Sequence, residues 1–112
     1  MQKPTRYFSK KQENAIAKVI GGKPTPNSGA RPYQKGDVST SGHGDNSWLI
    51  EAKTCTTAKQ SFAIKKEWLE MIKKESLEAG KMNYALAFSF GPNQPNYYIL
   101  SEQKFKELFD EN

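Results

Sequence analysis

The sequence contains little of what many small proteins use to stabilise a fold or bind a metal. Only one of its 112 residues is cysteine and only one is histidine. A lone cysteine excludes a disulfide within the chain. One cysteine and one histidine also cannot supply the ligands of a zinc finger or of a histidine-based metal centre. Any metal held by one chain must therefore be bound by carboxylates and other oxygen atoms.

Long hydrophobic runs are missing as well. No apolar stretch approaches the roughly 18 to 20 residues needed to span a bilayer, and residues 1–11 lack the apolar centre of a signal peptide. We therefore expect an intracellular, cytoplasmic protein without a membrane segment.

Positive charge is what the sequence has in excess. Seventeen lysines and arginines stand against 12 acidic residues, which gives a net charge of +5, and 36% of the residues are hydrophobic. This composition predicts one folded domain that covers residues 1–112. A basic surface attracts polyanions, and nucleic acid is the commonest such partner.

The first predicted helix places a carboxylate where an apolar residue is expected. Ser9 and Gln12 have the spacing of a capping box, and Gly21 can end a helix, so we predict a helix over residues 9–20. Glu13 shares one stripe of this helix with Ile16 and Ile20. An acidic side chain on a stripe that should be buried suggests a function.

The remaining pattern predicts an α/β fold. The glycine- and proline-rich residues 21–36 indicate a loop leading to an irregular strand, and a hairpin loop at 39–46 joins a strand near Val38 to an antiparallel strand at 48–54. A helix at 65–81, strands at 84–90 and 97–100, and a last helix capped by Ser101 follow. We expect a mixed β-sheet flanked by helices, in the order α-β-β-α-β-β-α, or α-β-β-β-α-β-β-α with the irregular strand counted.

The strand at 48–54 carries the residues of most chemical interest. Because side chains alternate along a strand, Glu51 and Lys53 share one face, while Ala52 points to the other. Such a pair alone is more often a solvated ion pair. Asp37, however, precedes Glu51 across the hairpin, and two carboxylates roughly 4 Å apart repel by about 4 kcal/mol unless a cation lies between them. Mg²⁺ suits such a place, since one or two carboxylates and several waters bind it.

These residues resemble a known family. Asp37 followed by Glu51-Ala52-Lys53 looks like the D…(D/E)-x-K motif of the PD-(D/E)XK nucleases, and Glu13 matches the acidic residue of their first helix. The set is most similar to archaeal-type Holliday junction resolvases and their phage relatives, whose conserved serine corresponds to Ser28. The chain departs from the motif's name at Gly36, where proline is expected.

The resemblance implies a restriction-endonuclease-like fold and a role in DNA recombination, and the phage relatives imply a phage as one source of the protein. Asp37, Glu51 and the carbonyl oxygen of Ala52 would hold Mg²⁺ or Mn²⁺, and Glu13 would bind it directly or through a water. Lys53 would orient the attacking water, and Ser28 would lie near the scissile phosphate. The expected reaction is metal-assisted hydrolysis of a phosphodiester bond without a covalent intermediate.

Several residues keep a second interpretation. Asp45 replaces Asp37 as ligand if the hairpin register differs, and Ser28 is equally suited to a turn. His43, between two glycines, is expected to be exposed and without a catalytic role. Cys55 is expected to be a small buried residue rather than a nucleophile. Trp48 and Trp68 are expected in the core rather than in base stacking.

The expected partner is DNA, contacted through its backbone. Candidates for phosphate contacts are Lys23, Arg31, Lys35, Lys59, Lys65 and Lys66. Because cutting two strands symmetrically needs two active sites and one chain has one acidic set, we expect a two-fold homodimer. A nicking or restriction-like duplex nuclease, and a non-catalytic DNA-binding module with a nuclease fold, remain as alternatives to a junction resolvase.

Overall fold

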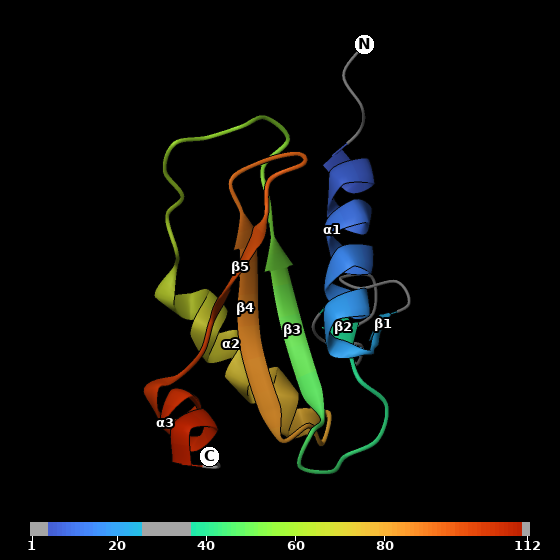
Figure 1. Ribbon diagram of the computed structural model, residues 1–112, viewed down its shortest axis with the longest axis vertical. Helices are drawn as coiled ribbons and strands as arrows, with labels where there is room; N and C mark the ends of the chain where they lie inside the picture. Colours follow the sequence, from blue (N-terminus) through green and yellow to red (C-terminus); the bar gives the residue numbers. More distant parts are fainter. Residues whose placement is uncertain (1–4, 26–36, 111–112) are drawn as a thin grey trace.

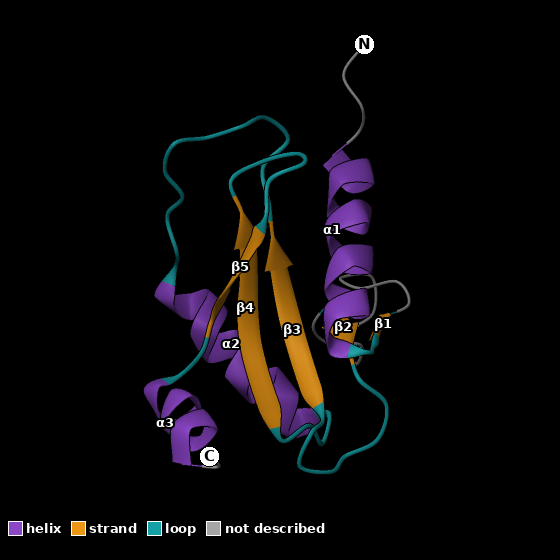
Figure 2. Ribbon diagram, in the orientation of Figure 1, coloured by secondary structure: helices purple, strands orange, loops and turns teal. Residues whose placement is uncertain are grey.

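A mixed β-sheet with helices on both faces forms the centre of the molecule (Figures 1 and 2). The computed structural model describes residues 5–25 and 37–110. In these residues the elements are α1 (Thr5–Ile20), β1 (Lys23–Pro24), β2 (Val38–Ser39), β3 (Trp48–Lys53), α2 (Lys66–Glu78), β4 (Asn83–Ser89), β5 (Asn96–Ile99) and α3 (Glu102–Asp110). This order, α-β-β-β-α-β-β-α in one α/β domain, confirms the predicted fold class. None of the helices in the described parts of the chain is long and apolar enough to cross a membrane.

The strands lie in their order along the chain, from β1 at one edge to β5 at the other. Neighbouring strands are antiparallel except β3 and β4, which are parallel. The predicted antiparallel hairpin is confirmed, with Val38 opposite Ile50. Two parallel neighbours require a crossover connection, and α2 lies within it. The centre of the sheet is therefore the β3–β4 pair.

The two faces of the sheet are covered by different helices (Figure 1). On the α1 side, the buried core consists of Ile16, Ala17, Val38, Ile50, Ala85 and Ala87. The alternate residues of β3 and β4 point to the opposite face, where Leu49 and Leu86 are buried and α2 covers the sheet. Glu51 and Lys53 belong to this second set, so they lie between the sheet and α2.

Helix α1 begins earlier than predicted. It starts at Thr5, so Ser9 lies inside the helix and the capping-box start at Ser9 is wrong. Residues 5–8 contain no glycine or proline to prevent helix formation, and the rings of Tyr7 and Phe8 pack edge to face with centroids 5.3 Å apart. The predicted end is confirmed, because the helix stops at Ile20 and Gly21 has a φ of 68°.

Helix α2 ends three residues before its predicted limit, at Glu78, and Gly80 follows it with a φ of 71°. Its buried stripe also differs at the end: Leu77 is 72% exposed, while Ser76 is 2% exposed. Ser76 continues the i, i+4 row from Ile72, and its hydroxyl donates a hydrogen bond to the carbonyl of Lys73, which satisfies the polar group in the core. The position of a residue on the buried row of the helix therefore decides its burial more than the polarity of its side chain does.

Helix α3 begins where predicted. The backbone N–H of Lys104 donates a hydrogen bond to the hydroxyl of Ser101 at 3.1 Å, which confirms Ser101 as the N-cap. Yet none of the residues of α3 is buried. An apolar stripe on a helix usually packs against the core. The apolar side chains of α3 do not do so.

Candidate active site

Asp37, which directly precedes β2, lies beside Glu51 of β3. Val38 pairs with Ile50, and the N–H of Asp37 donates to the carbonyl of Ile50 at 2.9 Å, which holds Asp37 against β3. Asp37 interacts with Glu51 both through its charge and through a side-chain hydrogen bond, so the two carboxyl groups are close together. The backbone N–H of Ala52 also donates to Oδ2 of Asp37 at 2.8 Å. The carboxylate of Asp37 is thereby held against β3, beside Glu51.

The closeness of these two acids changes the ionisation of Glu51. Burial, followed by the negative charge of Asp37, raises the pKa of Glu51 from 4.5 to about 7, and Lys53 acts in the opposite direction. The ammonium group of Lys53 therefore does not offset the combined cost of burial and repulsion. A site with two acids and too little positive charge can accept a cation.

Lys53 is held by contacts on two sides. Its Nζ lies 3.3 Å from Oε2 of Glu51 and 4.5 Å from the ring centroid of Trp68. The side chains of Lys53 and Glu51 remain 28% and 25% exposed. Both line an open pocket of about 340 Å³ between β3 and α2, with Trp68 and Glu67 on the α2 side. The ammonium group is positioned and still accessible from solvent.

The carbonyl of Ala52 is directed to the same side as Asp37. The carbonyls of Trp48 and Ile50 accept hydrogen bonds from Thr40 and Asp37, on the β2 side of β3. Carbonyls two residues apart along a strand point the same way, so that of Ala52 is also directed to this side. Together with the two carboxylates, it forms a set of hard oxygen donors.

Glu13 does not join this set in the structure. It lies on α1, which packs on the Ile50 face of the sheet, whereas Glu51 points to the face that α2 covers. Within residues 5–25 and 37–110, no three histidine, cysteine, aspartate or glutamate side chains are grouped closely enough to hold one metal ion. The expectation of three carboxylates around one cation is therefore not met, and a role for Glu13 stays a prediction.

The structure shows which of Asp37 and Asp45 lies near Glu51. Asp45 is exposed in the loop between β2 and β3, where its carbonyl accepts a hydrogen bond from the side chain of Asn83. Asn83 pairs with Trp48, at the start of β3, whereas Glu51 is further along the strand. Asp37, rather than Asp45, therefore lies beside Glu51.

The structure describes only some of the residues predicted to contact DNA or the scissile phosphate. Ser28, Arg31 and Lys35 lie outside the described residues. Lys23, Lys59, Lys65 and Lys66 are exposed, as phosphate contacts must be, and Nζ of Lys65 is 5.8 Å from the ring centroid of Trp68. These four lysines remain candidates for DNA contacts.

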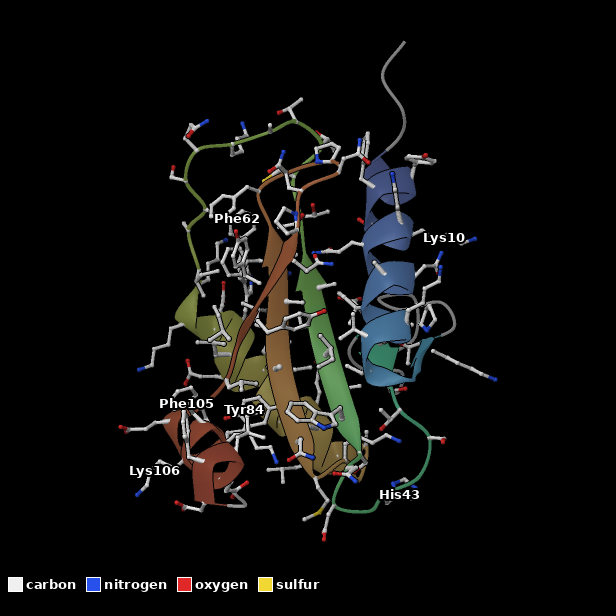
Figure 3. All side chains as sticks on the ribbon, viewed as in Figure 1. Lys10, His43, Phe62, Tyr84, Phe105 and Lys106 are labelled. Carbon is white, nitrogen blue, oxygen red and sulfur yellow. The ribbon has the colours of Figure 1, made fainter. Side chains whose placement is uncertain are left out.

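His43, Cys55 and the two tryptophans have structural environments of their own. His43 is exposed in the loop between β2 and β3 (Figure 3). Its Nδ1 lies 2.9 Å from the carbonyl oxygen of Gly80. Cys55 is half-buried rather than buried. Trp48 is partly buried against the α1-side core, as expected, whereas Trp68 is half-buried at the pocket and faces Lys53.

Gln12 is a residue of the site that the sequence interpretation missed. It is 7% exposed, and its side-chain amide donates to the carbonyl of Lys53 at 2.8 Å and to Oδ1 of Asn96 at 3.0 Å. Gln12 therefore links α1 to the end of β3 directly at Lys53. Its position four residues before the buried Ile16 was a signal that it faces the sheet.

Three further lysines also escaped the sequence interpretation. Lys10, Lys11 and Lys18 are exposed on α1, and Nζ of Lys11 donates to Oδ1 of Asn93 at 2.6 Å. Figure 3 shows Lys10 extending from α1 away from the sheet. The seven-residue spacing of Lys11 and Lys18 places them on one side of a helix and was visible in the sequence.

Comparison of this chain with family models, with curated proteins and with solved structures found no match.

Proposed function

We propose that this protein is a divalent-metal-dependent DNA endonuclease that hydrolyses phosphodiester bonds, with branched DNA as its preferred substrate. The observation that carries the proposal is the closeness of the carboxyl groups of Asp37 and Glu51 beside β3, with Lys53 in contact with Glu51. The resemblance to PD-(D/E)XK nucleases supports it, because these are the positions that the motif requires.

The donor atoms fit Mg²⁺ or Mn²⁺. Asp37, Glu51 and the carbonyl of Ala52 offer oxygen atoms only, and Mg²⁺ needs no more than one or two carboxylates beside its waters. Burial and, after it, the negative charge of Asp37 raise the pKa of Glu51, so a cation beside the two carboxylates would reduce their repulsion. When bound there, a divalent ion would lower the pKa of a coordinated water and offset negative charge on the phosphate.

The residues of the chain supply orientation and charge. Lys53, fixed by Glu51 and by the ring of Trp68, presents an ammonium group at the pocket, where it offsets charge that develops on the phosphate oxygens. The bond from the N–H of Ala52 holds the Asp37 carboxylate in one orientation. Gln12 acts as a positioning residue, because it fixes the backbone at Lys53.

The basic surface supports DNA as the substrate. With a net charge of +5 and exposed lysines on α1, β1, α2 and the connection between β3 and α2, the protein can bind phosphates without reading bases. The sequence contains no recognisable base-reading module, so recognition would depend on the shape of the DNA. A branched substrate, such as a four-way junction, offers such a shape.

Incubation with labelled DNA tests this function. A four-way junction and a linear duplex of the same sequence are each mixed with the protein, with Mg²⁺ and with a chelator. We expect cleavage of the junction that requires Mg²⁺, stops in Lys53→Ala, and is slower on the duplex.

The other outcomes identify the alternatives. Equal Mg²⁺-dependent cleavage of both substrates indicates a nicking or restriction-like duplex nuclease. Binding without cleavage, identical in wild type and Lys53→Ala, indicates a non-catalytic DNA-binding module; the absence of a three-acid group in the described residues is the observation that favours this alternative.

A further inference from the structure

We propose that Tyr97 is a stacking site for an unpaired base of the DNA strand that reaches Lys53. The inference rests on the proposed function, because it takes DNA as the polymer bound beside Lys53. Tyr97 is one of three side chains, Phe62, Phe88 and Tyr97, that we call the ring stack. The rings of Phe62 and Phe88 are stacked with centroids 5.6 Å apart and 26° between their planes, and those of Phe88 and Tyr97 with 5.6 Å and 30°.

The ring stack begins beside the candidate active site. Lys53 of β3 pairs with Phe88 of β4, and Phe88 pairs with Tyr97 of β5. The three residues therefore form one row across the sheet, and their side chains share the face that α2 covers. Because neighbouring strands are about 4.8 Å apart, Lys53 and Tyr97 are on the order of 10 Å apart. This distance equals about three base steps of roughly 3.4 Å each.

Tyr97 is the exposed end of the ring stack. It is 49% exposed and lies on β5, at an edge of the sheet, whereas Phe62 and Phe88 are half-buried. Phe88 packs beside the Tyr97 ring, and the Phe90 ring meets it edge to face with centroids 5.9 Å apart. Figure 3 shows Phe62 on the β5 side of the sheet. A base can therefore continue the stack at Tyr97 without opening the core.

Lysines accompany the rings. The backbone N–H of Lys59 donates to the carbonyl of Phe90 at 2.7 Å, which brings the exposed Lys59 beside the ring stack. Nζ of Lys53 and of Lys65 are 4.5 and 5.8 Å from the ring centroid of Trp68, which lies 6.3 Å from that of Phe62. Surfaces that bind single-stranded nucleic acid combine aromatic rings for the bases with basic residues for the phosphates. This combination favours a nucleic acid strand over an apolar protein segment, which gains nothing from the lysines.

Acidic side chains indicate the path of the strand. Glu67 and Glu75 of α2 line the pocket that holds Glu51 and Lys53. Negative charge on α2 repels phosphate, so a strand that enters this pocket is expected to continue toward β5 rather than along α2. That direction brings its bases to Tyr97.

Stacking on Tyr97 selects for unpaired bases. A base within a duplex is already paired and stacked on its neighbours, and removing it from the stack costs free energy. A base that is unpaired where a branch begins does not carry this cost. Since every base has a π face, the ring stack does not read sequence. The preferred substrate is therefore DNA with an unpaired base within about three nucleotides of the scissile phosphate.

Fluorescence anisotropy with two labelled oligonucleotides tests the proposal. One is a chain of thymidylates, and the other has the same phosphates with abasic sugars; both are titrated in the presence of a chelator. The wild type should bind the thymidylate chain about 5- to 150-fold more tightly, the range for one stacked base. Tyr97→Leu, which keeps an apolar side chain beside Phe88, should bind both chains equally. Tyr97→Phe should keep the wild-type preference.

The controls separate stacking from a general loss of binding. Tyr98→Leu is the matched variant, because Tyr98 is 37% exposed on the same strand and points to the opposite face, and it should keep the preference. Tyr97→Thr, which suits an exposed strand position, is the second variant without a ring. Circular dichroism identifies the folded variants.

Three results would overturn the proposal: equal affinity of the wild type for the two oligonucleotides, a preference that survives in Tyr97→Leu or Tyr97→Thr, or a preference that is lost in Tyr97→Phe or Tyr98→Leu. The first of these needs no variant. Because binding is measured in chelator, the result does not depend on cleavage. Failure to cut a four-way junction would count against the proposed function and not against stacking at Tyr97.

Discussion

Replacement of Asp37 by asparagine should lower the rate of Mg²⁺-dependent junction cleavage by about 10²- to 10³-fold, the range seen when one electrostatic contact to a transition state is removed. The asparagine keeps the size of the side chain and can still accept a hydrogen bond from the N–H of Ala52. What it loses is the negative charge. Cleavage rates under single-turnover conditions measure the effect.

DNA binding separates a catalytic defect from a folding defect. Asp37→Asn removes a negative charge that would face phosphate, so affinity for the junction without metal should be retained or increased. Asp45→Asn is the matched control, since Asp45 is exposed in the β2–β3 loop away from Glu51, and it should cleave at the wild-type rate. Equal activity of the wild type and Asp37→Asn, or a greater loss in Asp45→Asn, would refute the assignment.

Replacement of Glu51 by glutamine should make the metal-free protein more stable at high pH. The pKa of Glu51 is raised to about 7, so between about pH 4.5 and 7 the folded state binds more protons than the unfolded state. The free energy of unfolding therefore falls as pH rises through this window. Glutamine does not titrate, so the free energy of unfolding of the variant should exceed that of the wild type by on the order of 2 to 3 kcal/mol near pH 8 and by little near pH 4.

Urea unfolding in the presence of a chelator, at both pH values, measures this gain. Glu70→Gln is the control, because Glu70 is an exposed carboxylate on α2 outside the pocket. Its stability should follow that of the wild type at both pH values. If Glu51→Gln changed the free energy of unfolding equally at both pH values, or not at all, then burial and Asp37 would not destabilise the charged form of Glu51.

The sequence was sufficient for most of the fold because the local signals agreed. Alternation in β3, the helical stripe of α2 and the N-cap at Ser101 each depend on neighbours within a few residues. The errors arose where a nearby signal competed with packing. Ser9 had the spacing of a cap, yet helix-compatible residues precede it, and Leu77 was apolar, yet the buried row passes through Ser76.

The candidate site was less predictable, since it depends on relations across the sheet. Asp37 directly precedes β2, and the hairpin that pairs β2 with β3, which the sequence predicted, brings its carboxyl group beside Glu51. The position of Glu13 relative to that pair depends on which face α1 covers, and no local pattern reports this. The same holds for Gln12 and for Trp68, whose contacts with Lys53 join residues far apart in the chain.

Binding of Mn²⁺, followed by electron paramagnetic resonance, tests the central claim most directly. Asp37 and Glu51 together should hold one ion for each wild-type chain, and Asp37→Asn and Glu51→Gln should each weaken that binding strongly, while Asp45→Asn leaves it unchanged. Wild-type protein that binds no Mn²⁺ would contradict the account. So would Mn²⁺ binding that is as strong in Asp37→Asn and in Glu51→Gln as in the wild type.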